Sequence, residues 1–521
     1  MASAVRDETS RESALAALDV PVLTLLCAVK LMLHLFTSCR HYGYFRDELY
    51  FLDLARHLDW GYVDCAPLIA VYAKLALMMG GSLAALRILP ALAGTLLIAL
   101  SMLIARELGG ARYAQFLTGL AVLLCPGILV MDSLLTMNAF EPLFWMGCIL
   151  LLARFLRFGN SRLWIWFGVL AGLGIENKHS TVFFLVAVTI ALLLTEHRRE
   201  WLKPWIWIGT AILLALAAPN FLWQLHHHFP MLEDMENVRR MHKNVVLSPA
   251  AFVKEQIIDT HPILFPVWLS GLVWLLASRR WRLLGLTFAV FFATMEALHA
   301  KSYYLFPIYP LVLAAGAVAI DSWLTLKDSS RWVLSLRLRT AIVLLILFAG
   351  AATLPVSTWM LSPSQLVAYE ARIGFKPAKT EVSHESLLPQ PIADQFGWRE
   401  MTRQVAYLYN SLPPEVRAKT AIIAGNYGEA GAINLFGPRY GLPIAISTHQ
   451  NYWYWGPPQK QYENLIALQA NLGDIQSLCT SYQSIDHYDR YGMAEENTPI
   501  YLCRGVKFDF AEKWPQWKKW N

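Results

Sequence analysis

Long apolar runs alternate with short polar loops over the first two thirds of the chain. Eleven such runs lie between Pro21 and residue 357, separated by charged or proline-containing segments. An apolar run of about 20 residues is typical of a helix that crosses a bilayer. The expected spans are 21–38, 84–105, 113–131, 137–156, 163–176, 180–195, 204–222, 262–277, 282–298, 305–322 and 340–357. Several are shorter than a straight crossing needs, which is tolerated where the break is buried in protein or lines a wet cavity.

The loop after the first run has an amphipathic pattern. In Tyr42-Gly-Tyr-Phe-Arg-Asp-Glu-Leu-Tyr-Phe51 two adjacent carboxylates, Asp47 and Glu48, precede apolar residues that recur every three positions. Those apolar residues are Leu49, Leu52, Ala55 and Leu58. The spacing predicts a helix lying along the bilayer surface, and a second half-apolar helix follows from Ile69 to Met79. The acid pair either caps the first helix, where the helix dipole favours negative charge, or performs chemistry at the membrane surface.

The pattern changes near Ser362. Residues 362–521 lack a long apolar run and are rich in Gly, Pro, Asn, Tyr and Trp. Trp398 to Tyr409 has helical spacing, and the order strand, turn, helix, strand is expected over Thr420–Ala424, Gly425–Glu429, a helix to Phe436, and Leu442–Ser447. That order predicts a small α/β domain. The Gly425-Asn-Tyr-Gly-Glu429 turn is either a tight turn between strand and helix or a cradle for a phosphate or sugar, although it lacks the GxGxxG spacing.

The predicted fold is mainly α: a polytopic transmembrane helix bundle of about eleven spans with amphipathic helices in the first outer loop, plus a small C-terminal α/β domain. We expect a cytoplasmic tail over residues 1–20, a transmembrane domain over 21–357 and an extracytoplasmic domain over 362–521. Lysine and arginine gather in alternate loops, which sets the orientation. The clusters are Arg106 with Arg112, then Arg154, Arg157 and Arg162, then Arg198, Arg199 and Lys203, then Arg279, Arg280 and Arg282, then Lys327, Arg331, Arg337 and Arg339. With the N-terminus in the cytoplasm, all five clusters are cytoplasmic.

Composition agrees with a membrane protein. Of 521 residues, 56% are hydrophobic and 16% are charged, and 20 tryptophans suit two aromatic belts. The net charge of +6 is too small and too spread to indicate nucleic-acid binding. The seven cysteines include no CxxC pair. Cys479 and Cys503 lie in the region placed outside the cytoplasm, where a disulfide can form.

Polar residues of the outer loops meet at one face of the membrane in this topology. Asp47 and Glu48 follow the first span, Asp132 follows the third, Lys178 and His179 separate the two most compressed spans, and Lys301 precedes the tenth. A carboxylate can accept the proton of an acceptor hydroxyl, and a departing lipid phosphate needs fixed positive charge. An outer-face enzyme has no ready supply of nucleotide sugars or ATP, so a lipid-phosphate sugar is the expected donor.

Each of these residues has a structural alternative. Asp132 could cap the following helix, Lys178 could mark a helix end, and Lys301 could extend towards the membrane surface. Glu141 and Glu296 lie near outer helix ends and could be paired structural acids or part of the site. A solvated loop is favoured over a metal site for His226, His227 and His228, since consecutive side chains point in different directions.

Four short motifs resemble the GT-C class of integral membrane glycosyltransferases, within the dolichyl-phosphate-mannose protein mannosyltransferases (glycosyltransferase family 39). The bacterial branch that includes lipid A aminoarabinose transferase, with the related lipopolysaccharide galacturonosyltransferases, is nearest. The motifs are Asp47-Glu48, Asp132 with Leu135-Thr-Met-Asn138, Gly172-Leu-Gly-Ile-Glu-Asn-Lys-His179, and Lys301-Ser-Tyr-Tyr304 through Tyr309-Pro310. The likeness covers roughly residues 20–325. Gly425–Glu429 and Ser447–Gly456 also resemble the soluble extension of some bacterial members.

The resemblance implies attack at the anomeric carbon with inversion. It gives Asp47 the role of general base, Glu48 that of its partner, and Asp132 that of orienting the acceptor or a bound cation. Lys178 would hold the donor phosphate. The other residues expected at the substrate are Lys301, Tyr304, His179 and Tyr44.

The implied partners are a polyprenyl-phosphate sugar donor, an envelope glycan, lipid or protein acceptor, and membrane lipid, with no nucleic acid. The implied location is the bacterial inner membrane. Relatives often have His-Pro-Pro or Gln-Pro-Pro where this chain has Cys65-Ala66-Pro67. No role for histidine is carried over to that turn, and no metal cofactor is expected.

Two other functions fit a polytopic chain with an outer domain. One is a transporter or lipid flippase, and the other is a polysaccharide ligase with a larger lipid-linked donor. A carrier should place its polar groups near the bilayer midplane on broken helices, whereas here they gather at one face. A transferase is therefore the preferred hypothesis.

Overall fold

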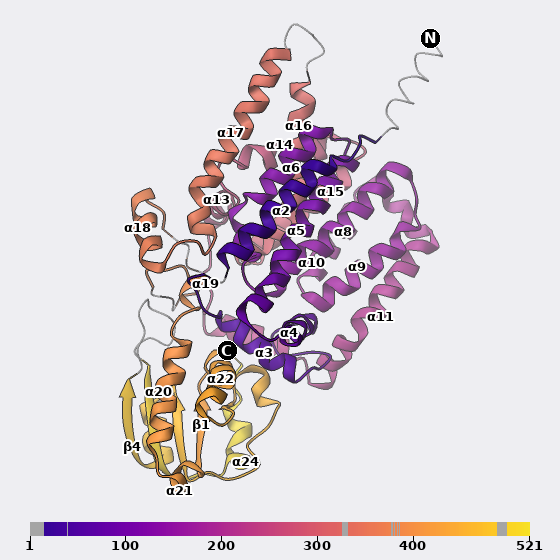
Figure 1. Ribbon diagram of the computed structural model, residues 1–521. Coiled ribbons are helices and arrows are strands. Elements are labelled where there is room, and N and C mark those ends of the chain that lie inside the picture. Colours follow the sequence, from indigo (N-terminus) through magenta and orange to yellow (C-terminus); the bar gives the residue numbers. More distant parts are fainter. Residues whose placement is uncertain are drawn as a thin grey trace, which may run out of the picture.

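The computed structural model describes residues 15–38, 40–325, 332–376, 379, 381–382, 384, 386–486 and 498–520. The chain is mostly helical, and a bundle of helices is followed by a domain with a small sheet (Figure 1). Each expected apolar span coincides with helix. The helices are α2 (Val20–Thr37), α5 (Leu83–Glu107), α6 (Arg112–Leu123) with α7 (Pro126–Met131), α8 (Met137–Phe158), α9 (Leu163–Asn177), α10 (Thr181–Leu193), α11 (Pro204–His226), α14 (Phe265–Ala277), α15 (Arg282–Ala297), α16 (Tyr309–Leu324) and α17 (Trp332–Ser357).

Not all of these helices are long enough to cross a bilayer alone. Six of the described helices qualify by length and apolarity: α2, α5, α8, α11, α17, and α16 taken together with η2 (Ser302–Ile308). A seventh is added if α10 and η1 (Glu196–Leu202), which are bent by 108°, form one span. Helices α9 and α14 are shorter, as expected. The total of eleven spans stays a prediction.

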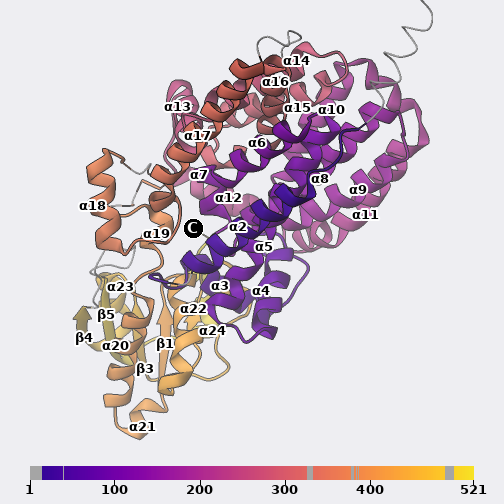
Figure 2. The ribbon, with the colours of Figure 1, turned by 45° about the horizontal axis from the view of Figure 1, so that its top comes forward.

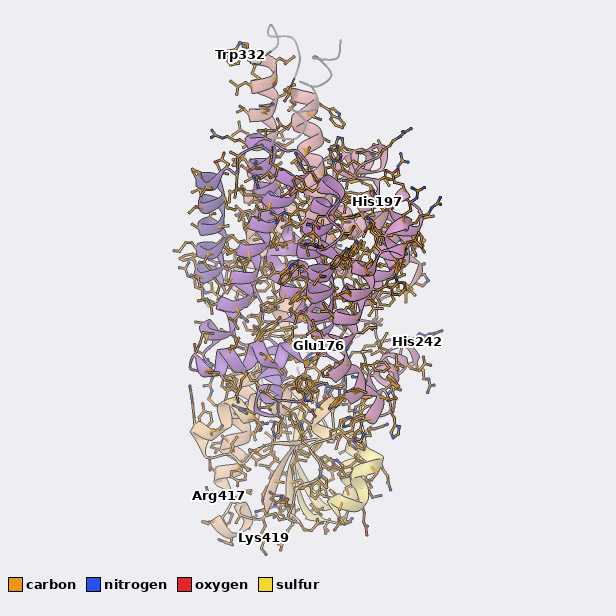
Figure 3. The ribbon with its side chains drawn as sticks, turned by 90° about the vertical axis from the view of Figure 1, so that its right-hand side faces the viewer. Glu176, His197, His242, Trp332, Arg417 and Lys419 are labelled. Carbon is orange, nitrogen blue, oxygen red and sulfur yellow. A yellow bond between two sulfur atoms is a disulfide. The ribbon has the colours of Figure 1, made fainter. Side chains whose placement is uncertain are left out.

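The basic loops gather at the end of the bundle away from the sheet. Arg106 donates a hydrogen bond to the carbonyl of Ala16, Arg157 donates to that of Glu107, and Arg339 pairs with Asp321 at 2.7 Å. Figure 3 shows His197 and Trp332 towards this end and Arg417 and Lys419 at the opposite one. The predicted separation of basic loops from the sheet domain is therefore present.

The C-terminal sheet has five strands in the order β2-β1-β3-β5-β4. Strand β1 (Thr420–Ala424) pairs in parallel with β2 (Ile446–Ser447) and β3 (Asn464–Leu468), and β5 (Pro499–Val506) is antiparallel to β3 and to β4 (Cys479–Asp486). A disulfide joins Cys479 to Cys503 with their Cα atoms 5.6 Å apart, as the sequence allowed. The accompanying helices are α18 (Pro363–Ile373), α19 (Gln390–Ala393), α20 (Trp398–Ser411), α21 (Pro414–Arg417), α22 (Tyr427–Phe436), α23 (Leu472–Leu478) and α24 (Phe510–Lys513).

Two short helices of the loop that follows α2, α3 (Arg46–Arg56) and α4 (Leu68–Met78), lie between the bundle and the sheet domain (Figures 1 and 2). Leu49, Leu52 and Ala55 of the expected apolar face are buried, as is the rest of the helix from Glu48 to Ala55, whereas Leu58 lies beyond the helix and is exposed. Protein therefore covers more of α3 than the expected apolar face, and its position along the bilayer surface stays a prediction. Helix α22 packs across α3 and covers its polar side, including Asp53.

Two glycines let α22 approach the backbone of α3. A Cβ atom on Gly431 would lie 2.8 Å from the backbone carbonyl of Leu49, and one on Gly428 would lie 2.6 Å from Cγ of Arg46. Both separations are shorter than the usual contact of two carbon atoms. The helix pair therefore depends on the absence of side chains at these two positions.

The substitution Gly431→Ala tests this contact. The added methyl group meets backbone, which cannot rotate away, so we expect a packing cost of about 1–3 kcal/mol and a lower melting temperature of the detergent-solubilised protein. Gly473→Ala is the control, since its Cβ would meet only the side chain of Asn471 at 3.4 Å. Equal melting temperatures for the two variants would contradict the close packing of α22 on α3.

Candidate active site

Glu48 fixes the N-terminal end of α3. Its side chain is fully buried, and its carboxylate accepts hydrogen bonds from the backbone N–H groups of Phe45 at 2.9 Å and Leu135 at 3.0 Å. Arg87 of α5 donates to the two carboxylate oxygens from Nε at 3.2 Å and Nη2 at 3.1 Å. A buried carboxylate with this many donors is a satisfied ion pair. Glu48 therefore positions its neighbours and is closed to solvent.

Asp47, the preceding residue, is more open. Its side chain is 32% exposed. Oδ1 accepts a hydrogen bond from the phenol of Tyr427 at 2.8 Å and lies 3.8 Å from Nε of Arg46. Both of these contacts involve Oδ1. Within the described residues, Oδ2 of Asp47 has no hydrogen-bond partner. Asp47 thus presents one carboxylate oxygen without a partner, which is what a general base needs.

Lys178 follows the last residue of α9 and is held by an acid and two aromatic rings. Its Nζ donates to Oε2 of Glu141 at 2.9 Å and lies 4.5 Å from the ring centre of Tyr304 and 5.9 Å from that of Tyr303. Ser180 donates to the other oxygen of the same carboxylate. Glu141 is therefore an acid in an ion pair, which is the first of the two alternatives that the sequence left open for it. The lysine side chain is 14% exposed, so its ammonium group is held in place by these neighbours and is still accessible to a ligand.

Tyr303 lies beside Lys178 and within electrostatic range of Asp47. Its ring contacts that of Tyr304 with centres 4.9 Å apart, and its phenol interacts electrostatically with Asp47 and Glu381. Lys301 and Lys243 in turn interact with Glu381. These residues form one group at the junction of the bundle and the sheet domain. We call it the junction cluster: Arg46, Asp47, Asp64, Lys178, Lys243, Lys301, Tyr303, Tyr304, Glu381 and Tyr427.

Burial and neighbouring charges shift the pKa values of several residues in the junction cluster. Burial raises the pKa of Asp64 to about 7, and the charges of Asp234 and Asp47 add to the effect, while the phenol of Tyr50 donates to it at 3.1 Å. Burial alone would raise the pKa of Glu381, but the positive charges of Arg46, Lys243 and Lys301 lower it. Burial also lowers the pKa of Lys243. Perturbed titrating groups of both signs in one place are typical of a functional site.

Three other expected site residues have partners away from the junction cluster. Asp132 is 1% exposed and pairs at 2.7 Å with Lys30, which is fully buried in α2. Tyr44 is buried and donates to the carbonyl of Gly81 at 3.2 Å. The ring of His179 forms a 2.9 Å hydrogen bond with Asn220 of α11. The structure therefore brings together Asp47, Lys178, Lys301 and Tyr304, and shows supporting contacts for the other four.

Six members of the junction cluster were not singled out from the sequence: Arg46, Asp64, Lys243, Tyr303, Glu381 and Tyr427. Asp64 stands in the polar, aromatic stretch of the first outer loop, and Tyr427 stands inside the Gly-Asn-Tyr-Gly-Glu turn, so both had a local signal. Lys243 follows α12 (Pro230–Arg240) in a long loop and had none. Its place in the cluster depends on tertiary structure alone.

No group of three or more His, Cys, Asp or Glu side chains is arranged to hold a metal ion within the ranges that the structure describes. The expectation that no metal takes part stays a prediction.

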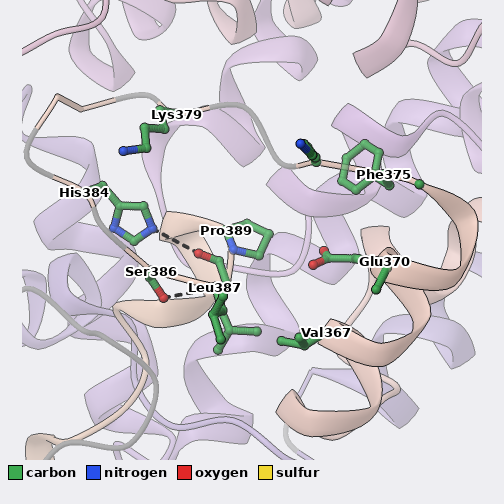
Figure 4. Close-up of a pocket in the computed structure, with 12 residues that line it drawn as sticks. Val367, Glu370, Phe375, Lys379, His384, Ser386, Leu387 and Pro389 are labelled. Carbon is green, nitrogen blue, oxygen red and sulfur yellow. Dashed lines mark hydrogen bonds between the residues drawn. The ribbon is translucent and has the colours of Figure 1, made fainter.

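A hollow of about 380 Å³ lies apart from the junction cluster, between α18 and the segment that leads to α19 (Figure 4). Glu370 lines it, and burial raises the pKa of this residue to about 7. No residue of the junction cluster lines this hollow.

The raised pKa of Asp64 gives a test of the electrostatics. The folded protein holds the Asp64 proton up to about pH 7, whereas the unfolded chain releases it near pH 4, so the wild type loses stability as pH rises through this window. Asp64→Asn keeps an acceptor for Tyr50 and removes the titration. We expect its melting temperature relative to wild type to rise between pH 5 and pH 8. The exposed Asp474→Asn variant should follow wild type at both pH values, and a constant difference for Asp64→Asn would contradict the raised pKa.

A family model described as dolichyl-phosphate-mannose-protein mannosyltransferase matches residues 64–223. No curated protein sequence matches the chain. Among solved structures, the chain is similar to ArnT from Cupriavidus metallidurans bound to undecaprenyl phosphate, with a TM-score of 0.58 and 16% identity over 93% of this chain and 98% of that one.

Two larger proteins share the fold. The mycobacterial arabinofuranosyltransferase AftD has a TM-score of 0.54 and 14% identity over 95% of this chain and 40% of that one. The archaeal oligosaccharyltransferase AglB from Archaeoglobus fulgidus, in complex with an inhibitory peptide and a dolichol-phosphate, has a TM-score of 0.50 and 10% identity over 82% of this chain and 64% of that one. The chain therefore shares the fold of these three transferases, and its residues 64–223 match the mannosyltransferase family model.

Proposed function

We propose that this enzyme transfers a sugar from a polyprenyl-phosphate donor to an acceptor of the cell envelope, with Asp47 as the general base. The observation that carries the proposal is the unpartnered Oδ2 of Asp47 in the same cluster as Lys178 and Tyr304. Two proteins of similar fold support the donor class, because one was solved with undecaprenyl phosphate and the other with a dolichol-phosphate.

The proposed reaction is a single displacement. The oxygen of an acceptor hydroxyl attacks the anomeric carbon from the side opposite the phosphate, and its proton passes to Oδ2 of Asp47. The bond from the anomeric carbon to the phosphate oxygen breaks, and its electron pair stays with that oxygen. Polyprenyl phosphate leaves, and the configuration of the sugar inverts. Proton acceptance by a placed carboxylate is worth roughly a factor of 10²–10⁴ in rate.

Lys178 is the proposed partner of the donor phosphate. Its ammonium group is held in place by Glu141 and by the ring of Tyr304, so it needs little rearrangement to meet an anion. Negative charge grows on the leaving phosphate in the transition state, and a fixed cation there lowers the barrier. Lys301 adds positive charge from the start of η2.

Glu48 and Asp132 have positioning roles in this proposal. Glu48 binds the N–H group of Leu135, and Asp132 lies in the same turn between α7 and α8. The Lys30–Asp132 pair therefore secures the turn that holds Glu48. Tyr44 and His179 support the site through Gly81 and Asn220.

The proposed orientation places the junction cluster and the sheet domain outside the cytoplasm of a bacterial inner membrane, with the N-terminus inside. The basic loops at the far end of the bundle support it, because such loops stay in the cytoplasm. The Cys479–Cys503 disulfide supports it as well, since disulfides persist in oxidising compartments. The resemblance of the sequence motifs to lipid A aminoarabinose transferase favours lipid A or another envelope glycolipid as acceptor. The location of the polar residues at one end of the bundle disfavours a transporter.

Mass spectrometry of envelope lipids and glycans from cells with and without the gene identifies the modification. Complementation with Asp47→Asn then tests the base. The amide cannot accept the proton, so we expect normal membrane insertion and a loss of about 10²-fold or more in product. Asp474→Asn, an exposed acid in the sheet domain, should restore the product fully. Full complementation by Asp47→Asn would exclude Asp47 as the base.

Binding of undecaprenyl phosphate to the purified protein tests Lys178. Removing a charge-assisted contact worth about 1.5–3 kcal/mol should weaken the affinity about tenfold or more. The variant is Lys178→Met with Glu141→Gln, which avoids leaving a buried carboxylate unpaired. Lys254→Met, on the exposed side of α13 (Pro249–Asp259), is the control. Unchanged affinity in the double variant would place the phosphate elsewhere.

A further inference from the structure

The Gly425-Asn-Tyr-Gly-Glu429 turn fixes where α22 begins. The side chain of Asn426 accepts from the N–H of Glu429 at 3.0 Å, and the carboxylate of Glu429 accepts from the N–H of Gly425 at 2.8 Å. Reciprocal bonds of this kind satisfy the free N–H groups at a helix start. Lys519 also donates to the carbonyl of Gly425 at 2.7 Å. Tyr427, the first residue of the helix, therefore leaves the sheet domain in one defined direction.

The ring of Tyr427 is held from both sides of the junction. It stacks on Tyr50 of α3 with centres 4.8 Å apart and on His449 of the sheet domain at 5.0 Å. The backbone N–H of Tyr427 donates to Nδ1 of His449 at 3.1 Å. The guanidinium of Arg46 lies 5.6 Å from the ring centre. These contacts aim the phenol at α3, where it meets Asp47.

We propose that Tyr427 is a positioning residue of the active site, through which the sheet domain completes the catalytic centre formed by the membrane bundle. Its phenol O–H donates to Oδ1 of Asp47, which fixes the orientation of the carboxylate and leaves Oδ2 for the acceptor hydroxyl. The inference rests on the proposed function of Asp47. The inference gives the sheet domain a role in positioning the base, whereas the sequence indicated only where this domain lies.

Arg46 explains why a neutral donor is needed. The guanidinium Nε lies 3.8 Å from the same Oδ1, and Nη2 lies 3.7 Å from Asp394, so the arginine is shared between two acids without a close bond to either. Without the phenol, the carboxylate of Asp47 is free to rotate into a close ion pair with Arg46. A close pair would draw the base away from the acceptor and stabilise it against taking a proton. The phenol holds the carboxylate in place without that charge.

Tyr427→Phe removes the hydroxyl and keeps the ring that stacks on Tyr50 and His449. The matched control is Tyr452→Phe, because Tyr452 is a buried tyrosine of the same domain and its phenol donates at 2.5 Å to Asp53 on the same helix. Asp53 keeps Asn434 and Arg56 as partners. The two substitutions thus delete the same atom against two carboxylates of α3, only one of which is the proposed base.

The measurement is the rate of product formation by the purified full-length variants, with the host polyprenyl-phosphate lipid extract as donor and the modification found by mass spectrometry as readout. A hydrogen bond to a charged acceptor is worth about 1.5–3 kcal/mol, so we expect kcat to fall roughly 10- to 100-fold in Tyr427→Phe. KM for the donor lipid should stay within about twofold, and the acid limb of the pH–rate profile should move to lower pH, because the closer pair with Arg46 favours the ionised carboxylate. Tyr452→Phe should keep kcat within about threefold and leave the profile unchanged.

Wild-type kcat and pH profile in Tyr427→Phe would overturn the inference, as would equal losses of kcat in both variants with an unmoved profile. Failure to recover folded Tyr427→Phe at the yield of Tyr452→Phe would also overturn it, because that result assigns the hydroxyl to folding. Asp47→Asn separates this inference from the proposed function. If Asp47→Asn is inactive and Tyr427→Phe is normal, only the role of Tyr427 fails; if Asp47→Asn is active, the proposed base fails first.

Discussion

The buried ion pair between Glu48 and Arg87 is the interaction on which the site depends. Arg87 reaches from α5 to the start of α3 and also donates to the carbonyls of Ser38 and Gly43 and to the side chain of Gln395. Loss of one partner of a buried pair leaves a bare charge and costs about 3–5 kcal/mol. The arginine therefore holds the first span, the outer loop and the sheet domain to one helix end. Because Asp47 is the residue before Glu48, its direction follows from that pair.

The two adjacent acids divide one requirement between them. A base has to be reachable by the substrate, whereas a residue that sets geometry has to be buried with its hydrogen bonds satisfied. Glu48 meets the second condition with three donor residues, and Asp47 meets the first with one phenol and a distant guanidinium. The positive groups of the junction cluster stand on both sides: Arg46 beside Asp47, and Lys178 beside the two tyrosines of η2. A phosphosugar that reaches both sides would carry its negative charge towards the lysine and its reacting carbon towards the carboxylate.

Much of the architecture follows from local pattern, because apolar runs and turn residues act over short distances. The eleven expected spans coincide with helix, and β1 has the predicted bounds Thr420–Ala424. The predicted strand over Leu442–Ser447 is reduced to Ile446–Ser447, and β3 was missed although all five of its residues are buried. A short apolar run in the middle of a sheet carries no periodicity, so nothing local marks it.

The site was less accessible to sequence reasoning because its decisive partners are remote. Glu48 differs from Asp47 because its carboxylate binds Arg87 and the N–H group of Leu135. Both of these partners come from later helices and turns, so the difference cannot be read from the local sequence. The hydroxyl that meets Asp47 belongs to Tyr427, 380 residues further along the chain. The full burial of α3 also has a remote cause, since the amphipathic pattern predicts one covered face and α22 supplies the other. Conversely, Tyr44 and His179 were expected at the substrate because they adjoin motif residues, and adjacency in sequence did not bring them into the cluster.

The glycine pair on α22 has a consequence for how such enzymes can diversify. Because Gly431 meets the backbone of α3 directly, the fit between the helix bundle and the C-terminal domain depends at this point on bare main chain, in addition to the side-chain contacts of Tyr427 and Tyr452. A C-terminal domain exchanged from a related protein would therefore need a glycine at the position of Gly431, where the main chain of α3 leaves no room for a side chain. It would also need a phenol at the position of Tyr427 to meet Asp47. Away from these two positions the domain has more freedom to change its sequence, so one helix bundle could combine with different C-terminal domains.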